Sequence, residues 1–127
     1  MSDAPEELYY TEEHEWLRVE GDEVVVGITD YAQDSLTDIV YVELPEEGME
    51  VEEMDEFASV ESVKSVSAIY SPIAGTICAI NEALDDAPEL INEDPYGEGW
   101  IARITMQDAS VLEKMLSASN YLEQIGE

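Results

Sequence analysis

A short turn pattern that occurs twice in the middle of the chain constrains the fold more than any other feature. Residues 45–51 and 72–78 both read Pro-x-x-Gly-x-x-apolar, with an offset of 27 residues. In each copy, proline and glycine favour a turn that leads into a strand. Two such copies indicate a β fold of two similar halves, as in a flattened barrel.

The first third of the chain adds further strand signals. The β-branched runs 16–20 and 23–28 flank the turn residues Gly21-Asp22 and predict a hairpin. Residues 29–36 begin with an N-cap at Thr29-Asp30 and predict one or two helical turns. The apolar run 39–44 then returns to a strand.

The last third contains a loop, a strand and a helix. Residues 92–99 are polar and contain a proline and two glycines, which predicts a loop before a strand at 100–104. Residues 110–113 form a capping box, which predicts the start of a C-terminal helix. That helix is expected to dock on the sheet through one face, formed by Leu112, Met115, Leu116 and Ser119.

The acidity of the chain excludes one class of partner. It has 32 acidic and four basic residues, for a net charge of -28. Binding to nucleic acid needs basic patches that displace counterions, so no nucleic-acid partner is expected. Such a chain repels itself in dilute salt, whereas salt at 1 M shortens the Debye length to about 3 Å. Because the acids are spread over the whole chain, they indicate adaptation to a salt-rich cytoplasm, such as that of a halophilic prokaryote.

Several other classes of site and location are not expected. The chain has no run of about 18 apolar residues and begins with an acidic segment, so we expect a cytoplasmic protein that does not bind membranes. The single cysteine, Cys78, lies in an apolar run and is expected to be a buried structural thiol. No Cys/His cluster is present, and no metal site is expected.

One lysine is unusual in so acidic a chain. Lys114 lies beside Glu113 and reads as a solvated charge, but Lys64 lies among Ser, Val and Ala. Period-two patterning places Val60 and Ser62 on one face and Glu61 and Val63 on the other, with a hairpin tip at Lys64. An amine that protrudes from a tight turn is accessible to an acylating enzyme. A Schiff-base or ion-pair lysine is the alternative, with Glu61 as the nearest partner.

The residues around Lys64 resemble a known family. Glu61-Ser62-Val63-Lys64, followed by residues 69–75, is similar to the lipoyl-lysine segment of the H-protein family of the glycine cleavage system. Glu61 lies three residues before the lysine, Gly48 sixteen before and Gly75 eleven after, as in lipoyl domains in general. Other stretches resemble the family in the same order along nearly the whole chain: 14–16, 26–33, 40–45, 90–92 and 95–100.

The resemblance implies a mainly β fold and a carrier function. Family members are barrel-sandwich hybrids of two antiparallel sheets with short helices, which here would also have a C-terminal helix and form a single lipoyl-carrier domain over residues 1–127. The family bears lipoate on its lysine, here Lys64, and is not itself an enzyme. It takes the aminomethyl group of glycine from the pyridoxal-phosphate-dependent decarboxylase to the tetrahydrofolate-dependent aminomethyltransferase.

The resemblance also implies further partners and site residues. Dihydrolipoamide dehydrogenase reoxidises the carrier, and a lipoate ligase or lipoyltransferase loads it, with recognition through Glu61, Gly48 and Gly75. A monomer is expected. Matching positions place Glu15 in a cleft that shelters the aminomethyl group, with His14 nearby. Many relatives have Asp four residues after the lysine, where this chain has Ala68, so that the shelter would depend more on Glu15 or on another acid.

Three other carrier functions are alternatives. Some H-like proteins relay lipoyl groups to other complexes, and the sequence does not separate that role from glycine cleavage. Acyl carrier proteins are acidic and attach phosphopantetheine to the serine of an Asp-Ser-Leu triplet, as at Ser35. However, they are helical bundles, whereas the apolar runs here predict strands. Biotin carriers place their lysine between methionines, whereas Lys64 lies between Val63 and Ser65.

Overall fold

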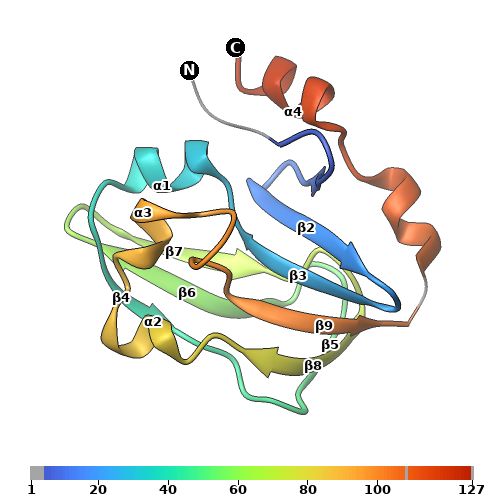
Figure 1. The fold of residues 1–127 in the computed structure, drawn as a ribbon, viewed down its shortest axis with the longest axis horizontal. Coiled ribbons are helices and arrows are strands. Elements are labelled where there is room, and N and C mark those ends of the chain that lie inside the picture. The colour runs from blue at the N-terminus through green and yellow to red at the C-terminus, as the bar shows by residue number, and fades with distance from the viewer. Residues whose placement is uncertain (1–4, 108, 127) are drawn as a thin grey trace.

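Two antiparallel sheets form the protein in the computed structural model, which describes residues 5–107 and 109–126. Short helices lie around the edges of the sheets (Figure 1). The predicted mainly β fold with two antiparallel sheets is confirmed. In the described part of the chain, none of the helices has the length and apolar character needed to cross a membrane.

The larger sheet has six strands. In spatial order they are β1 (Tyr9–Tyr10), β2 (Glu15–Glu20), β3 (Glu23–Ile28), β9 (Ala102–Met106), β8 (Gly75–Ile80) and β5 (Glu50–Val51). The predicted hairpin is β2–β3, and β9 begins two residues later than expected from the sequence. The strands β5 and β8, which begin within the two copies of the turn pattern, pair with each other through Val51 and Gly75.

The smaller sheet has three strands, and the central pair forms a long hairpin. Its spatial order is β4 (Ile39–Glu43), β6 (Glu56–Ser62) and β7 (Val66–Tyr70). The faces alternate as the sequence predicts, since Val60 and Ser62 are buried whereas Glu61 and Val63 are exposed. The hairpin β6–β7 therefore has one face in the core and one in solvent.

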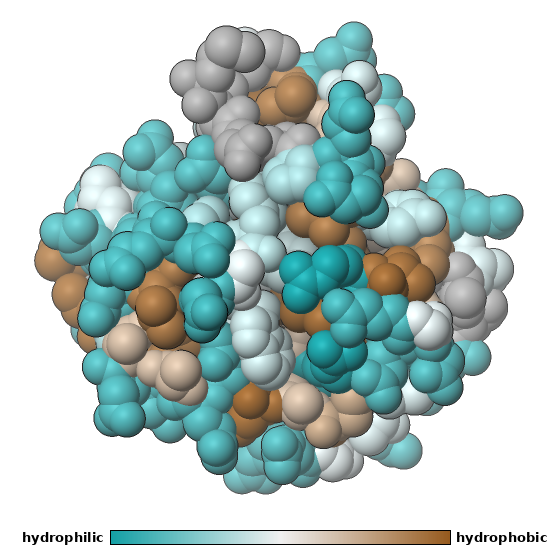
Figure 2. Space-filling model, viewed as in Figure 1, coloured by the Kyte–Doolittle hydropathy of each residue, from teal (hydrophilic) through white to brown (hydrophobic). Residues whose placement is uncertain are grey.

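The six-stranded sheet packs on both of its faces. A large apolar cluster fills the space between the two sheets, and includes Leu17 and Val24 of the larger sheet and Val60 of the smaller. A second cluster covers the opposite face near β1, formed by Leu8, Tyr10, Trp16, Val25, Ala118 and Tyr121. Burial on both faces explains why the run Val24 to Val26 is uniformly apolar rather than alternating. On the surface seen in Figure 2, hydrophilic side chains predominate and apolar ones form small separate patches.

Four short α-helices accompany the sheets in the described residues. They are α1 (Asp30–Leu36), α2 (Ala83–Asp86), α3 (Leu90–Glu93) and α4 (Ala118–Gln124), together with a 3₁₀ helix at Ala109–Lys114. The Thr29 side chain caps α1 as predicted, because its hydroxyl accepts a hydrogen bond from the Ala32 N–H. No pattern in the sequence predicts α2, and the last residues of α3 lie in the segment that was expected to form a loop.

The continuous C-terminal helix predicted from residue 110 is wrong. The chain forms the 3₁₀ helix and then an extended segment before α4 begins after its N-cap, Ser117. In that segment, Leu116 pairs with Tyr10 through two backbone hydrogen bonds of 2.8 and 2.9 Å. The pairing with β1 uses the Leu116 N–H and C=O, which a helix would have bonded internally. Of the predicted docking face, Leu112, Met115 and Leu116 are partly buried, but Ser119 is exposed.

The expectation that Cys78 is buried is also wrong, because its thiol is exposed. The pairing of β8 with β9 shifts between Ile77 and Ala79, so that Cys78 lies at an irregularity of the strand. Ile77 is fully buried and Cys78 faces outward, with its Sγ 3.4 Å from the Arg103 carbonyl oxygen.

Candidate functional site

The hairpin between β6 and β7 ends in a tip that Ser62 holds together. The Ser62 hydroxyl accepts hydrogen bonds from the N–H groups of Lys64 and Ser65, both at 3.1 Å. The Ser62 N–H donates to the Ser65 carbonyl at 2.8 Å, and the Val63 N–H donates to the Asp38 carbonyl at 3.2 Å. A small hydroxyl residue at position 62 therefore fixes the backbone that presents Lys64.

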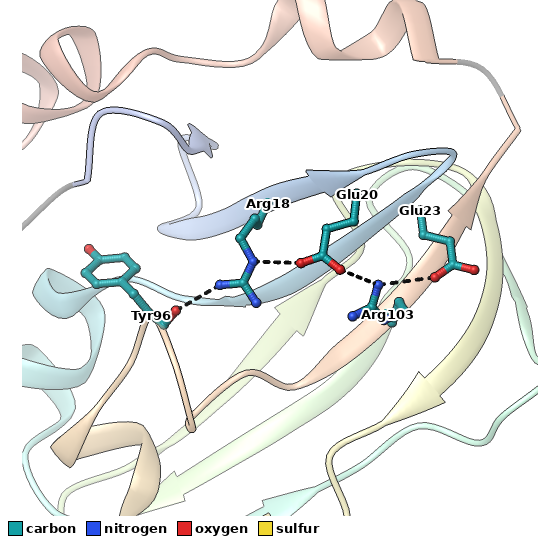
Figure 3. A network of polar contacts seen from close by, with 5 residues as sticks. All are labelled: Arg18, Glu20, Glu23, Tyr96 and Arg103. Carbon is teal, nitrogen blue, oxygen red and sulfur yellow. Dashed lines mark hydrogen bonds and ion pairs between the residues drawn. The ribbon is translucent and has the colours of Figure 1, made fainter.

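Lys64 is exposed at this tip, and its amine is not engaged in the charge network that uses the two arginines. Its Nζ donates to the Ser35 backbone carbonyl over 3.4 Å. Arg18 and Arg103 instead pair with Glu20 and Glu23 on the outer side of β2, β3 and β9 (Figure 3). The two arginines thus have structural partners, whereas the Lys64 amine lies against one neutral carbonyl group. The amine is accessible for covalent modification.

A groove of about 320 Å³ begins where Lys64 contacts α1. It lies between α1, the middle of β7 and the turn before β2. The lining combines apolar walls with a few polar groups: Glu13, His14, Ile28, Tyr31, Ala32, Ser35, Leu36, Ser67, Ala68 and Ile69. Since the Ser35 carbonyl accepts from Lys64 Nζ and Ser35 lines the groove, an arm attached to that nitrogen can enter the groove directly.

His14 lies on the groove wall in a fixed orientation. Its Nδ1 is 2.9 Å from the Tyr121 hydroxyl, and its ring lies 5.0 Å from the ring of Tyr31. Burial lowers the pKa of His14, and the nearby Glu13 carboxylate opposes that effect. The imidazole is therefore neutral at pH 7. The structure thus places His14 on the wall of this groove, and its place beside a sheltered aminomethyl group stays a prediction.

Glu15, which the resemblance placed in the cleft, is buried and is not among the residues that line the groove. Its side chain is only 2% exposed, and its carboxyl accepts hydrogen bonds from the Thr11 hydroxyl at 2.9 Å and from the Tyr70 N–H at 3.2 Å. Burial raises the pKa of Glu15 to about 7, and these two hydrogen bonds reduce the effect. Glu13, which the sequence analysis did not select, is the exposed carboxylate that lines the groove.

The three residues proposed for recognition by the loading enzyme lie in different environments. Glu61 is exposed on the outer face of β6, between its strand neighbours Tyr41 and Val66. Gly48 is an exposed turn residue with φ of +87°, a conformation that favours glycine. Gly75 is buried at the start of β8, where a Cβ would overlap the Thr105 carbonyl oxygen. A packing requirement therefore accounts for Gly75.

Comparison with known proteins decides the family. The family model described as "Glycine cleavage H-protein" matches residues 8–127. This chain belongs to the glycine cleavage H-protein family. The glycine cleavage system H protein of Staphylococcus carnosus is 54% identical over 124 residues, which cover 98% of each chain. That of Halalkalibacterium halodurans is 54% identical over 127 residues, covering 100% of this chain and 99% of the relative.

A solved structure agrees with the family assignment. The crystal structure of a glycine cleavage system H protein from Mycobacterium marinum superposes with a TM-score of 0.90 and 38% identity. The match covers 98% of this chain and all of that one. H proteins are carrier subunits and not catalysts, and the barrel-sandwich fold matches. The β architecture also excludes the acyl carrier alternative at Ser35, since that class is a helical bundle.

The structure also tests for a metal centre in the residues it describes. No group of three or more His, Cys, Asp or Glu side chains is placed to hold an ion there, despite the acidic composition.

Two residues beside His14, Tyr121 and Glu13, were not predicted as part of the groove region. Glu13 directly precedes His14 and could have been considered, whereas nothing local in the sequence indicates that Tyr121 contacts residue 14.

Proposed function

We propose that this H protein carries lipoate on Lys64 and transfers the aminomethyl group of glycine from the decarboxylase to the aminomethyltransferase. The single observation that carries the proposal is the exposed Lys64 amine at a fixed hairpin tip, next to a groove with apolar walls. Bound lipoate would supply a dithiolane that accepts the carried group and undergoes redox chemistry. The protein contributes a rigid base for the arm and a shelter from water.

The described residues fit such an arm. The apolar side chains of Ile28, Leu36 and Ile69 in the groove match the hydrocarbon part of a lipoyl group. At the far wall, His14 and Glu13 provide polar groups for the carried group. The arm remains attached to Lys64 when it leaves the groove. Once the protein binds a partner enzyme, this attachment raises the effective concentration of the carried group at that enzyme.

We propose that two acids protect the aminomethyl group, in the place of the aspartate that Ala68 replaces. The exposed carboxylate of Glu13 lines the same groove as Ala68, and it can hydrogen-bond a cationic amine directly. Glu15 follows His14 in the chain and pairs with Ile28, both of which line the groove, and its carboxyl is held by Thr11 and Tyr70. Its proposed role is to add negative charge near the groove when it ionises.

The partners follow from this function. We propose that the decarboxylase, the aminomethyltransferase and dihydrolipoamide dehydrogenase each receive the arm, and that a lipoate ligase or lipoyltransferase attaches it with recognition of Glu61, Gly48 and Gly75. Residues 1–127 would act as one domain, which the shared core between the sheets supports. A monomer in the cytoplasm remains a prediction.

The net charge of -28 supports a further proposal about habitat. We propose that the acidic surface is adapted to a salt-rich cytoplasm, where ions screen the repulsion among the carboxylates. The hydrophilic side chains spread over the face in Figure 2 fit a general adaptation better than a patch for one basic partner.

Intact mass after co-expression with a lipoate ligase tests the central claim. Wild-type protein should gain the mass of one lipoyl group, and Lys64→Arg should gain none. Lys114→Arg is the matched control, because Lys114 is the other lysine in the chain, and it should be loaded like wild type. Absence of the mass increment from wild type and variants alike would overturn the proposal.

The relay alternative is tested with the loaded protein. The proposed function predicts that, with the decarboxylase, the protein supports exchange of the glycine carboxyl group with bicarbonate. A relay predicts transfer of lipoate from Lys64 to another lipoyl domain, with no such exchange. Lys64→Arg should be inactive in both assays.

A further inference from the structure

The hydroxyl group of Tyr121 joins three segments that are far apart in the sequence. Its oxygen lies 2.9 Å from Nδ1 of His14 and 2.7 Å from Oγ1 of Thr29. Tyr121 comes from α4, His14 from the turn before β2, and Thr29 from the N-cap of α1. The Tyr121 ring is fully buried and stacks on Tyr10 at 4.9 Å with an interplanar angle of 13°. Packing of the ring therefore fixes the position of the hydroxyl.

The direction of the hydrogen bonds follows from Thr29. Its side chain is fully buried, and its oxygen already accepts from the Ala32 N–H at 3.2 Å. A buried hydroxyl proton needs an acceptor, and the Tyr121 oxygen lies within hydrogen-bond distance of Thr29 Oγ1. With Thr29 as the donor, the Tyr121 oxygen accepts, and the Tyr121 hydroxyl can donate its own proton to Nδ1 of His14 at 2.9 Å. Each donor in this series also accepts a hydrogen bond, which strengthens the next one.

The backbone of His14 holds the ring in place from the other side. Its φ is +69°, which is uncommon for a residue with a side chain and persists where the surroundings fix it. The His14 N–H donates to the Thr11 carbonyl at 3.2 Å, and the His14 carbonyl accepts from the Thr29 N–H at 3.0 Å. With Tyr31 beside the ring, His14 has little freedom to turn.

We propose that Tyr121 is a positioning residue that holds His14 as the neutral Nε2–H tautomer, with this N–H as a hydrogen-bond donor on the groove wall. Nδ1 is occupied by Tyr121, so Nε2 is the ring nitrogen available to the groove. The lowered pKa of His14 supports a neutral ring.

The role of the His14 Nε2–H as a donor to the arm on Lys64 rests on the proposed function. A neutral N–H binds acceptor atoms of an acyl arm on Lys64, such as its amide carbonyl or a sulfur. It does not favour a cationic amine, which is left to Glu13 on the same wall. His14 and Glu13 thus bind different parts of the loaded arm, and α4 takes part in the site through Tyr121 without lining the groove.

Nitrogen NMR of the unmodified protein tests the tautomer. His14 is the single histidine of the sequence, so its ring signals need no assignment by mutation. Long-range ¹H–¹⁵N spectra of ¹⁵N-labelled wild type should show a protonated Nε2 and an unprotonated Nδ1. Tyr121→Phe keeps the ring stack and removes the hydroxyl, and it should give a mixture of tautomers. Tyr31→Phe, which alters the other ring beside His14, should keep the wild-type tautomer.

Two outcomes would overturn the positioning role. One is an Nδ1–H tautomer in wild type, a result that does not depend on whether any variant folds. The other is an unchanged tautomer in Tyr121→Phe whose melting curve shows that it is folded.

Comparison of unmodified with lipoylated protein tests whether the His14 N–H binds the arm. It also separates this role from the proposed carrier function. Lipoylation of wild type should shift the His14 ring signals, and the shift should be smaller in Tyr121→Phe. Loading of Lys64 without any shift at His14 overturns the donor role and leaves the carrier function intact. Failure to load Lys64 overturns the carrier function, and with it the use of the donor, while the tautomer of the unmodified protein is still measured.

Discussion

Glu15 and Tyr70 connect the two sheets through a partly buried hydrogen bond. The Tyr70 backbone N–H donates to Oε2 of Glu15 over 3.2 Å. Glu15 is the first residue of β2 in the six-stranded sheet, and Tyr70 is the last residue of β7, in the hairpin that presents Lys64. The buried Glu15 carboxyl therefore joins the base of the hairpin β6–β7 to the turn that contains His14.

This carboxyl should make stability depend on pH. Burial raises the pKa of Glu15 from 4.5 to about 7, so the folded protein holds a proton that the unfolded chain releases. The stabilisation from the protonated form is fully present below pH 4.5 and is lost as pH rises through about 7. The shift corresponds to about 3 kcal/mol at most. Glu15→Gln should therefore lose less stability than wild type as pH rises through about 7, as measured by urea unfolding across this range.

Glu13→Gln is the matched control for this prediction. Glu13 is two residues away and exposed, so removal of its charge should leave most of the pH-dependent difference in place. In Glu15→Gln the amide oxygen can still accept from the Tyr70 N–H. Thr11 Oγ1 already accepts from the N–H groups of Glu13 and Glu15, so it cannot accept from the new amide and loses the acceptor of its own proton. The substitution therefore has a cost that does not depend on pH, and the test is the change of stability with pH. Parallel stability curves for wild type and Glu15→Gln would contradict the assignment of a raised pKa to this residue.

The local signals in the sequence were sufficient to predict the hairpin β6–β7 that presents Lys64. Alternation across β6, the small residues at its tip and the Thr29 cap each depend on residues within a few positions, and the structure has all three. The resemblance to H proteins added the family and the fold. The position of Lys64 at an exposed tip was thus predictable, although its attachment to lipoate stays a prediction.

The contacts that the sequence did not predict are long-range. The burial of Glu15 depends on Tyr70, 55 residues away. The orientation of His14 depends on Tyr121, 107 residues away. Leu116 leaves the helical pattern because its backbone pairs with Tyr10. Periodicity and capping describe neighbours along the chain, so they carry no information on such pairs.

Two glycines with the same predicted role should differ in their effect on stability. Alanine at Gly48 meets nothing within 4 Å but must adopt φ of +87°, which costs about 1 kcal/mol. Alanine at Gly75 places its Cβ on the backbone oxygen of Thr105, and strain of this kind costs about 3 kcal/mol. Urea unfolding of Gly48→Ala and Gly75→Ala should show this order, and equal losses would contradict the packing role of Gly75.

Salt should stabilise the protein even though it weakens the arginine network in Figure 3. Glu20 and Glu23 face each other across β2 and β3, and Arg103 lies between them at 2.8 and 3.2 Å. Salt at about 1 M screens these exposed pairs, but it also screens the repulsion from a net charge of -28. We expect the melting temperature to rise with KCl concentration. A fall would show that attraction outweighs repulsion.

Arg103→Gln provides the control for the salt experiment. The substitution leaves the carboxylates of Glu20 and Glu23 opposite each other without their shared cation, and like charges in that position destabilise a sheet. It should lower the melting temperature in dilute salt more than in concentrated salt. A loss that is independent of salt would assign the role of Arg103 to packing of its side chain.

Glu61 should affect loading of Lys64 without affecting the fold. Its side chain is exposed on the outer face of β6, beside Tyr41 and Val66, which are 52% and 65% exposed. We expect an enzyme that modifies Lys64 to contact this face, because Glu61 is the carboxylate of β6 that is nearest to Lys64 in the chain. Glu61→Ala should slow lipoylation at least tenfold, measured by intact mass over time with limiting ligase.

Glu43→Ala is the matched control, because Glu43 lies two residues along β4 from Tyr41 on the same face. Equal slowing in both variants would assign the effect to general charge, and no slowing in Glu61→Ala would remove Glu61 from recognition.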